Sequence, residues 1–160
     1  MSAHIVLTSH TPGRGDKAAH TIRWGAATPQ ERGPIVASVS AGHHRNAIGT
    51  HSGAYAITKA GVLLLSRQLA VEWGPSGVRS NTLCPGMTWT HMTEAAYSRP
   101  GEAELRSSAI PMRRIGQAQD MADAVVFLAS NRSSYVNGAD LVVDGGFTRN
   151  LMSMIPRTAS

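Results

Sequence analysis

The sequence predicts an α/β fold built on a parallel sheet with flanking helices. Three short strand candidates, at residues 34–39, 78–84 and 141–143, each stop at small or turn-forming residues. Helical patterns at 55–73 and 116–129 separate these candidates. Strands that alternate with helices are typical of a parallel sheet. Ligands of such sheets bind beyond the carboxyl ends of the strands, so we expect the functional residues at that edge.

Residues 1–32 allow two interpretations. In the first, residues 4–9 form a strand, and a glycine turn at 13–15 leads into a helix. The turn then fits the pattern G-x-G-x-x-A, in which amides at a helix start can meet a pyrophosphate. In the second, residues 16–25 are the remnant of a helix before the next strand, and everything earlier is a foreign or frayed leader.

Tyr55 and Lys59 stand at the start of a long apolar helical stretch. A helix places positions i and i+4 on one face, so the ammonium lies beside the phenol and favours its ionised form. A tyrosine in that setting can exchange protons near neutral pH. Ser40 directly follows the strand at 34–39 and is expected at the same edge of the sheet.

The helix that begins near Tyr55 carries apolar residues around nearly its whole circumference as far as Trp73, and residues 74–77 stop it. A helix that only covers a sheet keeps a polar stripe in water, and this one shows none. We therefore expect part of its surface to contact another subunit. The alternative is a helix that its own chain buries.

Two later turns are expected to meet at the functional edge. Pro85 and Gly86 follow the strand at 78–84, and an Asp-Gly-Gly turn at 144–146 follows the last strand. The carboxyl ends of parallel strands share one edge, which brings the two turns together.

Four elements together resemble the short-chain dehydrogenase/reductase family, and they occur in the family's order. They are Ser40, the Tyr-x-x-x-Lys of Tyr55 and Lys59, the Asn-x-x-x-Pro-Gly of residues 81–86, and the late Val-Asp-Gly-Gly of residues 143–146. The match runs from about Gly33 to Phe147, roughly the second half of the family's fold. The resemblance implies a truncated Rossmann-like sheet. Residues 33–160 would be its catalytic half, and residues 1–32 an atypical leader or a remnant of the nucleotide-binding half.

The resemblance implies an oxidoreductase that transfers hydride between NAD or NADP and an alcohol or carbonyl substrate. Tyr55 would be the acid or base, Lys59 would assist it and bind the cofactor's ribose, and Ser40 would hold the substrate oxygen. A carbonyl that accepts hydride does need one donor that gives up a proton and a second that orients it. The family also pairs its helices, which implies a homodimer or homotetramer.

The implied cofactor site includes Pro85, Gly86, Thr88 and Thr90 as well as Tyr55 and Lys59, with the threonines near the nicotinamide. The alternative is a polar loop that begins the next helix, with Thr90 or Thr93 as its cap.

Residues 93–112 are irregular in composition apart from a short turn at 102–107. In the family this region is the substrate lid. Loops of this kind are also plain connectors, and the residue types identify no substrate.

Two departures from the family pattern stand out. The spacing from Ser40 to Tyr55 is two residues longer than is usual, which makes Ser38 the fallback for the serine role. The family's catalytic asparagine and the residue that distinguishes NAD from NADP have no counterpart that we identify. An alternative function is therefore a catalytically inactive assembly module derived from such an enzyme, with impaired cofactor binding.

Composition fits one domain, with 160 residues of which 42% are hydrophobic and 16% charged. The single cysteine allows no internal disulfide, no apolar run reaches the roughly 18 residues of a membrane span, and the amino terminus lacks the core of a signal peptide. We expect a cytoplasmic protein without a membrane partner.

Two other ligand classes are considered and set aside. The net charge of +5 raises nucleic-acid binding, but the basic residues are scattered and aromatics form only 5% of the chain. His43, His44 and His51 have no cysteine or carboxylate at ligand spacing. We expect neither a nucleic-acid partner nor a metal site.

Overall fold

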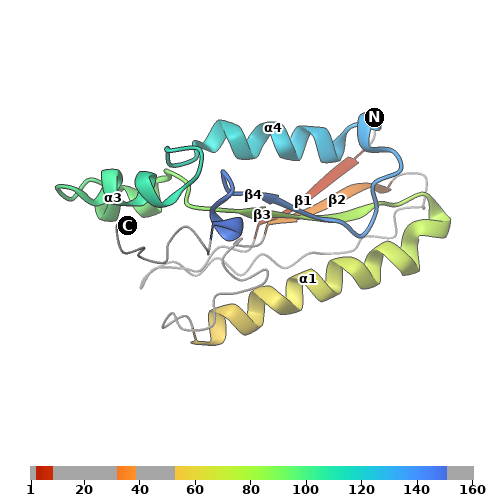
Figure 1. The fold of residues 1–160 in the computed structure, drawn as a ribbon. Coiled ribbons are helices and arrows are strands. Elements are labelled where there is room, and N and C mark those ends of the chain that lie inside the picture. The colour runs from red at the N-terminus through yellow and green to blue at the C-terminus, as the bar shows by residue number, and fades with distance from the viewer. Residues whose placement is uncertain (1–2, 9–31, 39–52, 151–160) are drawn as a thin grey trace, which may run out of the picture.

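A computed structural model describes residues 3–8, 32–38 and 53–150, in which four parallel strands form one sheet in the order β1-β2-β3-β4. The strands are β1 (Ala3–Thr8), β2 (Arg32–Ser38), β3 (Ser80–Pro85) and β4 (Asp140–Val143). The helices are α1 (Gly53–Trp73), α2 (His91–Tyr97), α3 (Glu102–Ala109) and α4 (Ala118–Ala129), with 3-10 turns η3 (Gly74–Ser76), η4 (Asn131–Ser133) and η5 (Phe147–Arg149). Helix α1 covers one face of the sheet and α4 the other (Figure 1). The predicted α/β fold with flanking helices is confirmed.

Strand β1 pairs in parallel with β2, with Thr8 opposite Ser38. It therefore matches the first interpretation of the amino-terminal segment. A frayed leader is therefore wrong for residues 3–8, whereas the origin of residues 1–32 as a leader or a remnant stays a prediction. The glycine turn at 13–15 and the helix expected at 16–25 lie outside the described residues.

Strand β3 is the buried centre of the described fold. Its residues from Ser80 to Cys84 are almost completely buried. Cys84 packs against Leu63 of α1, whereas Leu83 packs against Leu128 of α4. Adjacent residues of a strand point to opposite faces, so one strand anchors both helix layers.

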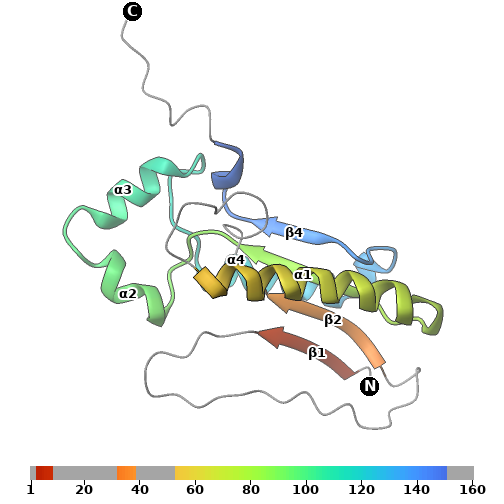
Figure 2. The same cartoon turned by 90° about the horizontal axis from the view of Figure 1, so that it is seen from below.

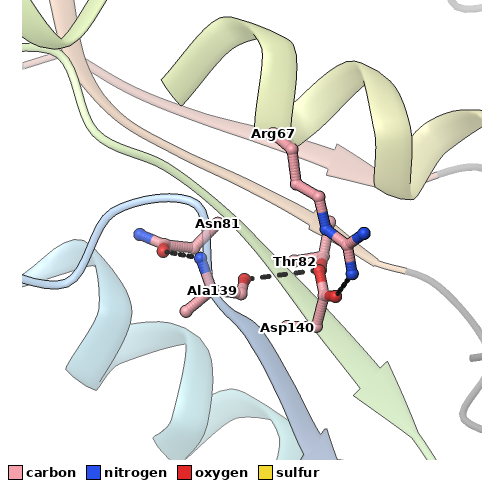
Figure 3. Close-up of polar contacts among 5 residues, drawn as sticks. All are labelled: Arg67, Asn81, Thr82, Ala139 and Asp140. Carbon is pink, nitrogen blue, oxygen red and sulfur yellow. Dashed lines mark hydrogen bonds and ion pairs between the residues drawn. The ribbon is translucent and has the colours of Figure 1, made fainter. Parts of the chain in front are cut away.

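Polar side chains fix β4 and α1 to this central strand (Figure 3). The Thr82 hydroxyl donates to Asp140 Oδ1 at 2.6 Å, and Arg67 of α1 forms an ion pair with Asp140 Oδ2. The Ala139 N–H donates to Asn81 Oδ1 at 3.0 Å. Buried polar groups are stable only when they are hydrogen-bonded, so these contacts specify one register of β4 against β3.

The side of α1 that faces away from the sheet carries an exposed apolar row. Ile57, Leu64 and Val71, spaced by seven residues, are 77%, 67% and 75% exposed. Such a spacing keeps the three side chains close to one line along a helix. The interpretation in which the chain itself buries the whole helix is therefore wrong for these residues.

The region predicted to be irregular, 93–112, contains most of α2 and all of α3. Both helices are short and neither has a continuous apolar face, which is why periodicity did not predict them. Tyr97 and Ile110 hold the region in place through a shared apolar cluster with Ile115. These helices lie beyond the ends to which the strands point (Figure 2).

None of the described helices is both long and apolar enough to cross a bilayer.

Candidate active site

Tyr55 and Lys59 come together in the first turns of α1. The Lys59 Nζ atom lies 5.3 Å from the centroid of the Tyr55 ring. The amino end of this helix lies toward the end of the sheet to which the strands point (Figure 2). A positive charge at this range favours an ionised phenol electrostatically. The structure thus brings the two side chains into the arrangement that their spacing predicts.

Lys59 is buried, with 4% of its surface exposed, because it shares the inner face of α1 with Leu63 and Ser66. Burial lowers the pKa of Lys59 from its ordinary value, since an apolar setting penalises the charged ammonium. A lysine is seldom buried to this extent, and its ammonium has little contact with water in this position.

The third proposed catalytic residue, Ser40, lies outside the described residues. Strand β2 ends at Ser38, opposite Leu83 of β3, so the chain reaches the carboxyl edge of the sheet shortly before Ser40. The assignments of Ser40 and of the fallback Ser38 stay predictions.

The turns after β3 and β4 meet as predicted. The Gly86 N–H donates to the Val143 carbonyl at 2.9 Å, and Pro85 pairs with Val143 in the ladder. A Cβ atom at position 86 would lie 2.5 Å from the Cβ of Asp144. Glycine at 86 is therefore required by the close approach of β4, and this packing reason holds with or without a bound ligand.

Asp144 organises the second turn. Its carboxylate accepts hydrogen bonds from the Gly146 N–H at 2.8 Å and from the Thr148 N–H and hydroxyl at 2.8 and 2.7 Å. Burial acts to raise the pKa of Asp144, but these hydrogen bonds and the charge of Arg149 outweigh burial and lower the pKa. The carboxylate thus stabilises the turn at residues 144–148 through its hydrogen bonds. It is ionised at neutral pH and is not a proton donor there.

The two threonines of the predicted cofactor site have different settings. Thr88 is buried and its hydroxyl donates to the Gly86 carbonyl at 3.1 Å. Thr90 is exposed and precedes α2, where its N–H donates to the Thr93 hydroxyl at 2.9 Å. Thr90 therefore caps α2 with Thr93, as the alternative interpretation expects, whereas Thr88 is bonded within the preceding turn. Their cofactor role stays a prediction, and a hydroxyl that donates in a loop can still accept from a ligand.

A pocket of about 290 Å³ lies between the end of β4 and the start of α4. Asp144 and Gly145 line one side of it, and Met121 lines another. At its rim, Arg114 binds Asp120 through two hydrogen bonds of 2.7 and 2.8 Å. This guanidinium is already neutralised, so the pocket has little attraction for an anion.

A second pocket, of about 540 Å³, lies among α3, η5 and the turn after β3. Arg106 and Arg113 line it together with apolar side chains. The sequence reasoning did not identify either arginine. Arg106 falls in the segment expected to be irregular and Arg113 directly follows it, so neither arginine belongs to a motif that could have indicated it.

Other reactive groups of the described part contribute no further site. The thiol of Cys84 is fully buried, and burial together with the charge of Asp140 raises its pKa to about 11. It therefore stays protonated at neutral pH. No group of three potential metal ligands occurs among the described residues. His43, His44 and His51 lie outside them.

Comparison with known proteins agrees with this arrangement. A family model described as enoyl-(acyl carrier protein) reductase matches residues 17–148. The 2-(R)-hydroxypropyl-CoM dehydrogenase of Xanthobacter autotrophicus is 44% identical over 95 residues, which are 59% of this chain and 38% of that protein.

Two solved structures show the same arrangement of elements. Aldohexose dehydrogenase of Thermoplasma acidophilum matches with a TM-score of 0.68 at 29% identity, over 79% of this chain and 51% of that one. Gluconate 5-dehydrogenase of Burkholderia cenocepacia, in complex with NADP and tartrate, matches with a TM-score of 0.65 at 30% identity, over 72% and 45%. The chain thus spans about half the length of these structures.

Proposed function

Because this chain belongs to the short-chain dehydrogenase/reductase family, we propose that it transfers hydride between NAD or NADP and an alcohol or carbonyl substrate. The observation that carries the proposal is the 5.3 Å approach of the Lys59 ammonium to the Tyr55 ring. This pair lies in a helix whose amino end faces the predicted binding edge. The activity and the substrate are proposals, since the chain matches only part of each relative.

Tyr55 gives its proton to the substrate oxygen in reduction and takes it back in oxidation. The ammonium of Lys59 stabilises the phenolate that remains, because it is close and poorly solvated. Ser40 donates a second hydrogen bond that orients the substrate oxygen. A bound nicotinamide cofactor supplies or accepts the hydride.

The cofactor is proposed to lie along the edge formed by Pro85, Gly86, Thr88 and Thr90. The exposed Thr90 offers a hydroxyl that fits a polar carboxamide or a ribose. The ammonium of Lys59 has three N–H donors, which suits the hydroxyls of a ribose.

The test combines cofactor binding and turnover. Calorimetry with NADH and NADPH is expected to give saturable binding, and Tyr55→Phe is expected to keep it while turnover falls roughly 10²–10⁴-fold. Tyr135→Phe is the matched control, because Tyr135 is fully exposed at 101%. If neither cofactor binds, the alternative of an inactive assembly module replaces the enzyme.

The exposed row on α1 supports a further proposal, that the chain forms a homodimer or homotetramer through this helix. Ile57, Leu64 and Val71 present an apolar line that a second copy of α1 would cover. We also propose that the ligand is a small-molecule substrate rather than a nucleic acid. The proposed location is the cytoplasm.

A further inference from the structure

The pocket among α3, η5 and the turn after β3 combines apolar side chains with two cations. Met87, Leu105 and Phe147 supply apolar surface, and Arg106 and Arg113 supply the charge. Its described lining contains no carboxylate. A hollow of this composition suits a small molecule with a carbon body and an anionic end.

Arg113 is held in place by its backbone. Its N–H donates to the Ile110 carbonyl at 2.8 Å, and the N–H of the preceding Met112 donates to the Gly145 carbonyl at 3.2 Å. Arg113 also has a φ of 57°, in the left-handed region that a residue with a side chain rarely adopts. The turn thus presents an arginine where glycine would be easier to accommodate.

The guanidinium of Arg113 has donors to spare. Its Nη1 donates to the Ser108 carbonyl at 2.6 Å, and an arginine carries five N–H donors. Among the described carboxylates, none forms an ion pair with Arg113. Its positive charge is therefore available to a ligand in the pocket.

Arg106 contributes differently. Its Nη1 lies 2.6 Å from Glu102 Oε2, and its Cζ lies 5.2 Å from the centroid of the Tyr97 ring. These contacts fix the guanidinium and neutralise much of its charge. The net positive charge of the pocket consequently comes from Arg113. Arg106 lines the pocket in a fixed position and offers additional N–H donors.

We infer that this pocket binds the anionic group of the substrate, so that the alcohol or carbonyl compound is a small organic acid. The inference rests on the proposed function and narrows it to a substrate class. Met87 lines the pocket and follows Pro85 and Gly86, the turn at which we propose the nicotinamide. The acid's charged end lies against Arg113, and its carbon chain lies along the apolar side.

The experiment compares two four-carbon probes on the full chain by calorimetry. Tartrate carries two carboxylates, whereas threitol has the same skeleton with neutral ends. We expect tartrate to bind in the millimolar range or tighter and threitol not to bind. Arg113→Gln is expected to weaken tartrate binding by roughly tenfold, the effect of losing a charge-assisted hydrogen bond.

Three variants separate charge from structure. Arg113→Lys keeps the charge and is expected to retain part of the affinity. Arg113→Gly relieves the positive φ, so it is expected to fold at least as well while it loses tartrate binding. Arg99→Gln is the matched control, because Arg99 is exposed and does not line the pocket.

The inference is overturned if wild type fails to bind tartrate, if threitol binds equally well, or if both Arg113→Gln and Arg113→Gly bind tartrate normally.

A further arm uses 2′-AMP, whose phosphate resembles that of NADP. Binding of 2′-AMP in place of tartrate, with loss in Arg113→Gln, would assign the pocket to the cofactor and also overturn the inference. Loss of tartrate binding with unchanged NADPH binding supports it. Tartrate binding that depends on Arg113, without any NADH or NADPH binding, would reject hydride transfer but keep the acid site.

Discussion

Helices α1 and α4 cover opposite faces of one sheet, yet they bury different chemistry (Figure 1). Helix α4 contacts the sheet through apolar residues, with Leu128 at the centre, 1% exposed. Helix α1 buries Lys59 and Ser66 beside Leu63. Helix α4 therefore meets the sheet with apolar side chains, whereas α1 also places a cation and a hydroxyl on its buried side.

The outer faces differ as well. Leu64 of α1 and Val126 of α4 are almost equally exposed, at 67% and 66%. Leu64, however, belongs to a row that runs the length of α1 with Ile57 and Val71, whereas α4 has acidic residues at positions 120 and 123 on its exposed turns. Helix α1 thus differs from α4 on both faces, because it buries polar side chains toward the sheet and carries an exposed apolar row on its outer side.

The largest expected effect comes from the inner face of α1. Lys59→Met keeps the length of the side chain and removes the ammonium, so turnover of a carbonyl substrate should fall roughly 10²–10⁴-fold. The free energy of unfolding should change little, because burial already penalises the charge. Nicotinamide absorbance and chemical denaturation measure the two quantities. If Lys59→Met had normal turnover, the inner face of α1 would have no role in catalysis through Lys59.

The inner face of α4 should behave in the opposite way. Leu128→Ala leaves a cavity against Leu83 and should lower the free energy of unfolding by about 2–5 kcal/mol. Turnover per folded molecule should stay normal, because Leu128 is expected to contact neither cofactor nor substrate. Urea titration gives the stability, and active-site titration gives the folded fraction. If turnover of the folded molecules fell as far as in Lys59→Met, α4 would need a role in the site.

The outer faces can be compared with one matched pair, Leu64→Glu and Val126→Glu. A charge in the middle of the α1 row should weaken self-association by about 2 kcal/mol or more, because it would be buried between two copies. The same change on α4 should leave association unchanged. Sedimentation equilibrium of both variants and wild type measures this. Equal behaviour of the two variants would show that the α1 row is not an interface.

The smallest effect is expected at Gly61, in the middle of α1. A Cβ atom there meets nothing within 4 Å, so Gly61→Ala should stabilise the isolated chain by up to about 1 kcal/mol through helix propensity. If a second α1 packs closely over this position, the same change should weaken the dimer instead. Thermal unfolding at several protein concentrations distinguishes a more stable isolated chain from a weaker dimer. A loss of stability that does not depend on concentration would contradict both expectations.

Local pattern predicted much of the fold and part of the site. The strand candidates that stop at turns correspond to β2, β3 and β4, and the Tyr55–Lys59 spacing predicted a shared face because a helix repeats every few residues. The segment 93–112 was predicted poorly. Its helices depend on an apolar cluster that includes Ile115 and Phe147, and no periodic signal within the segment reports such contacts.

The sequence alone predicts the order β2, α1, β3, α4 and β4, the i and i+4 neighbourhood of Tyr55 and Lys59, and the turns at the ends of these strands. These follow from backbone geometry and the preferences of adjacent residues. The tertiary structure alone decided that Lys59 is buried, that Arg67 pairs with Asp140, and that Arg113 faces a pocket without a neutralising partner among the described carboxylates. Arg67 and Asp140 are 73 positions apart. Burial and ion pairing between residues so far apart in the sequence depend on how the helices pack on the sheet. A pattern of neighbouring residues does not contain that information.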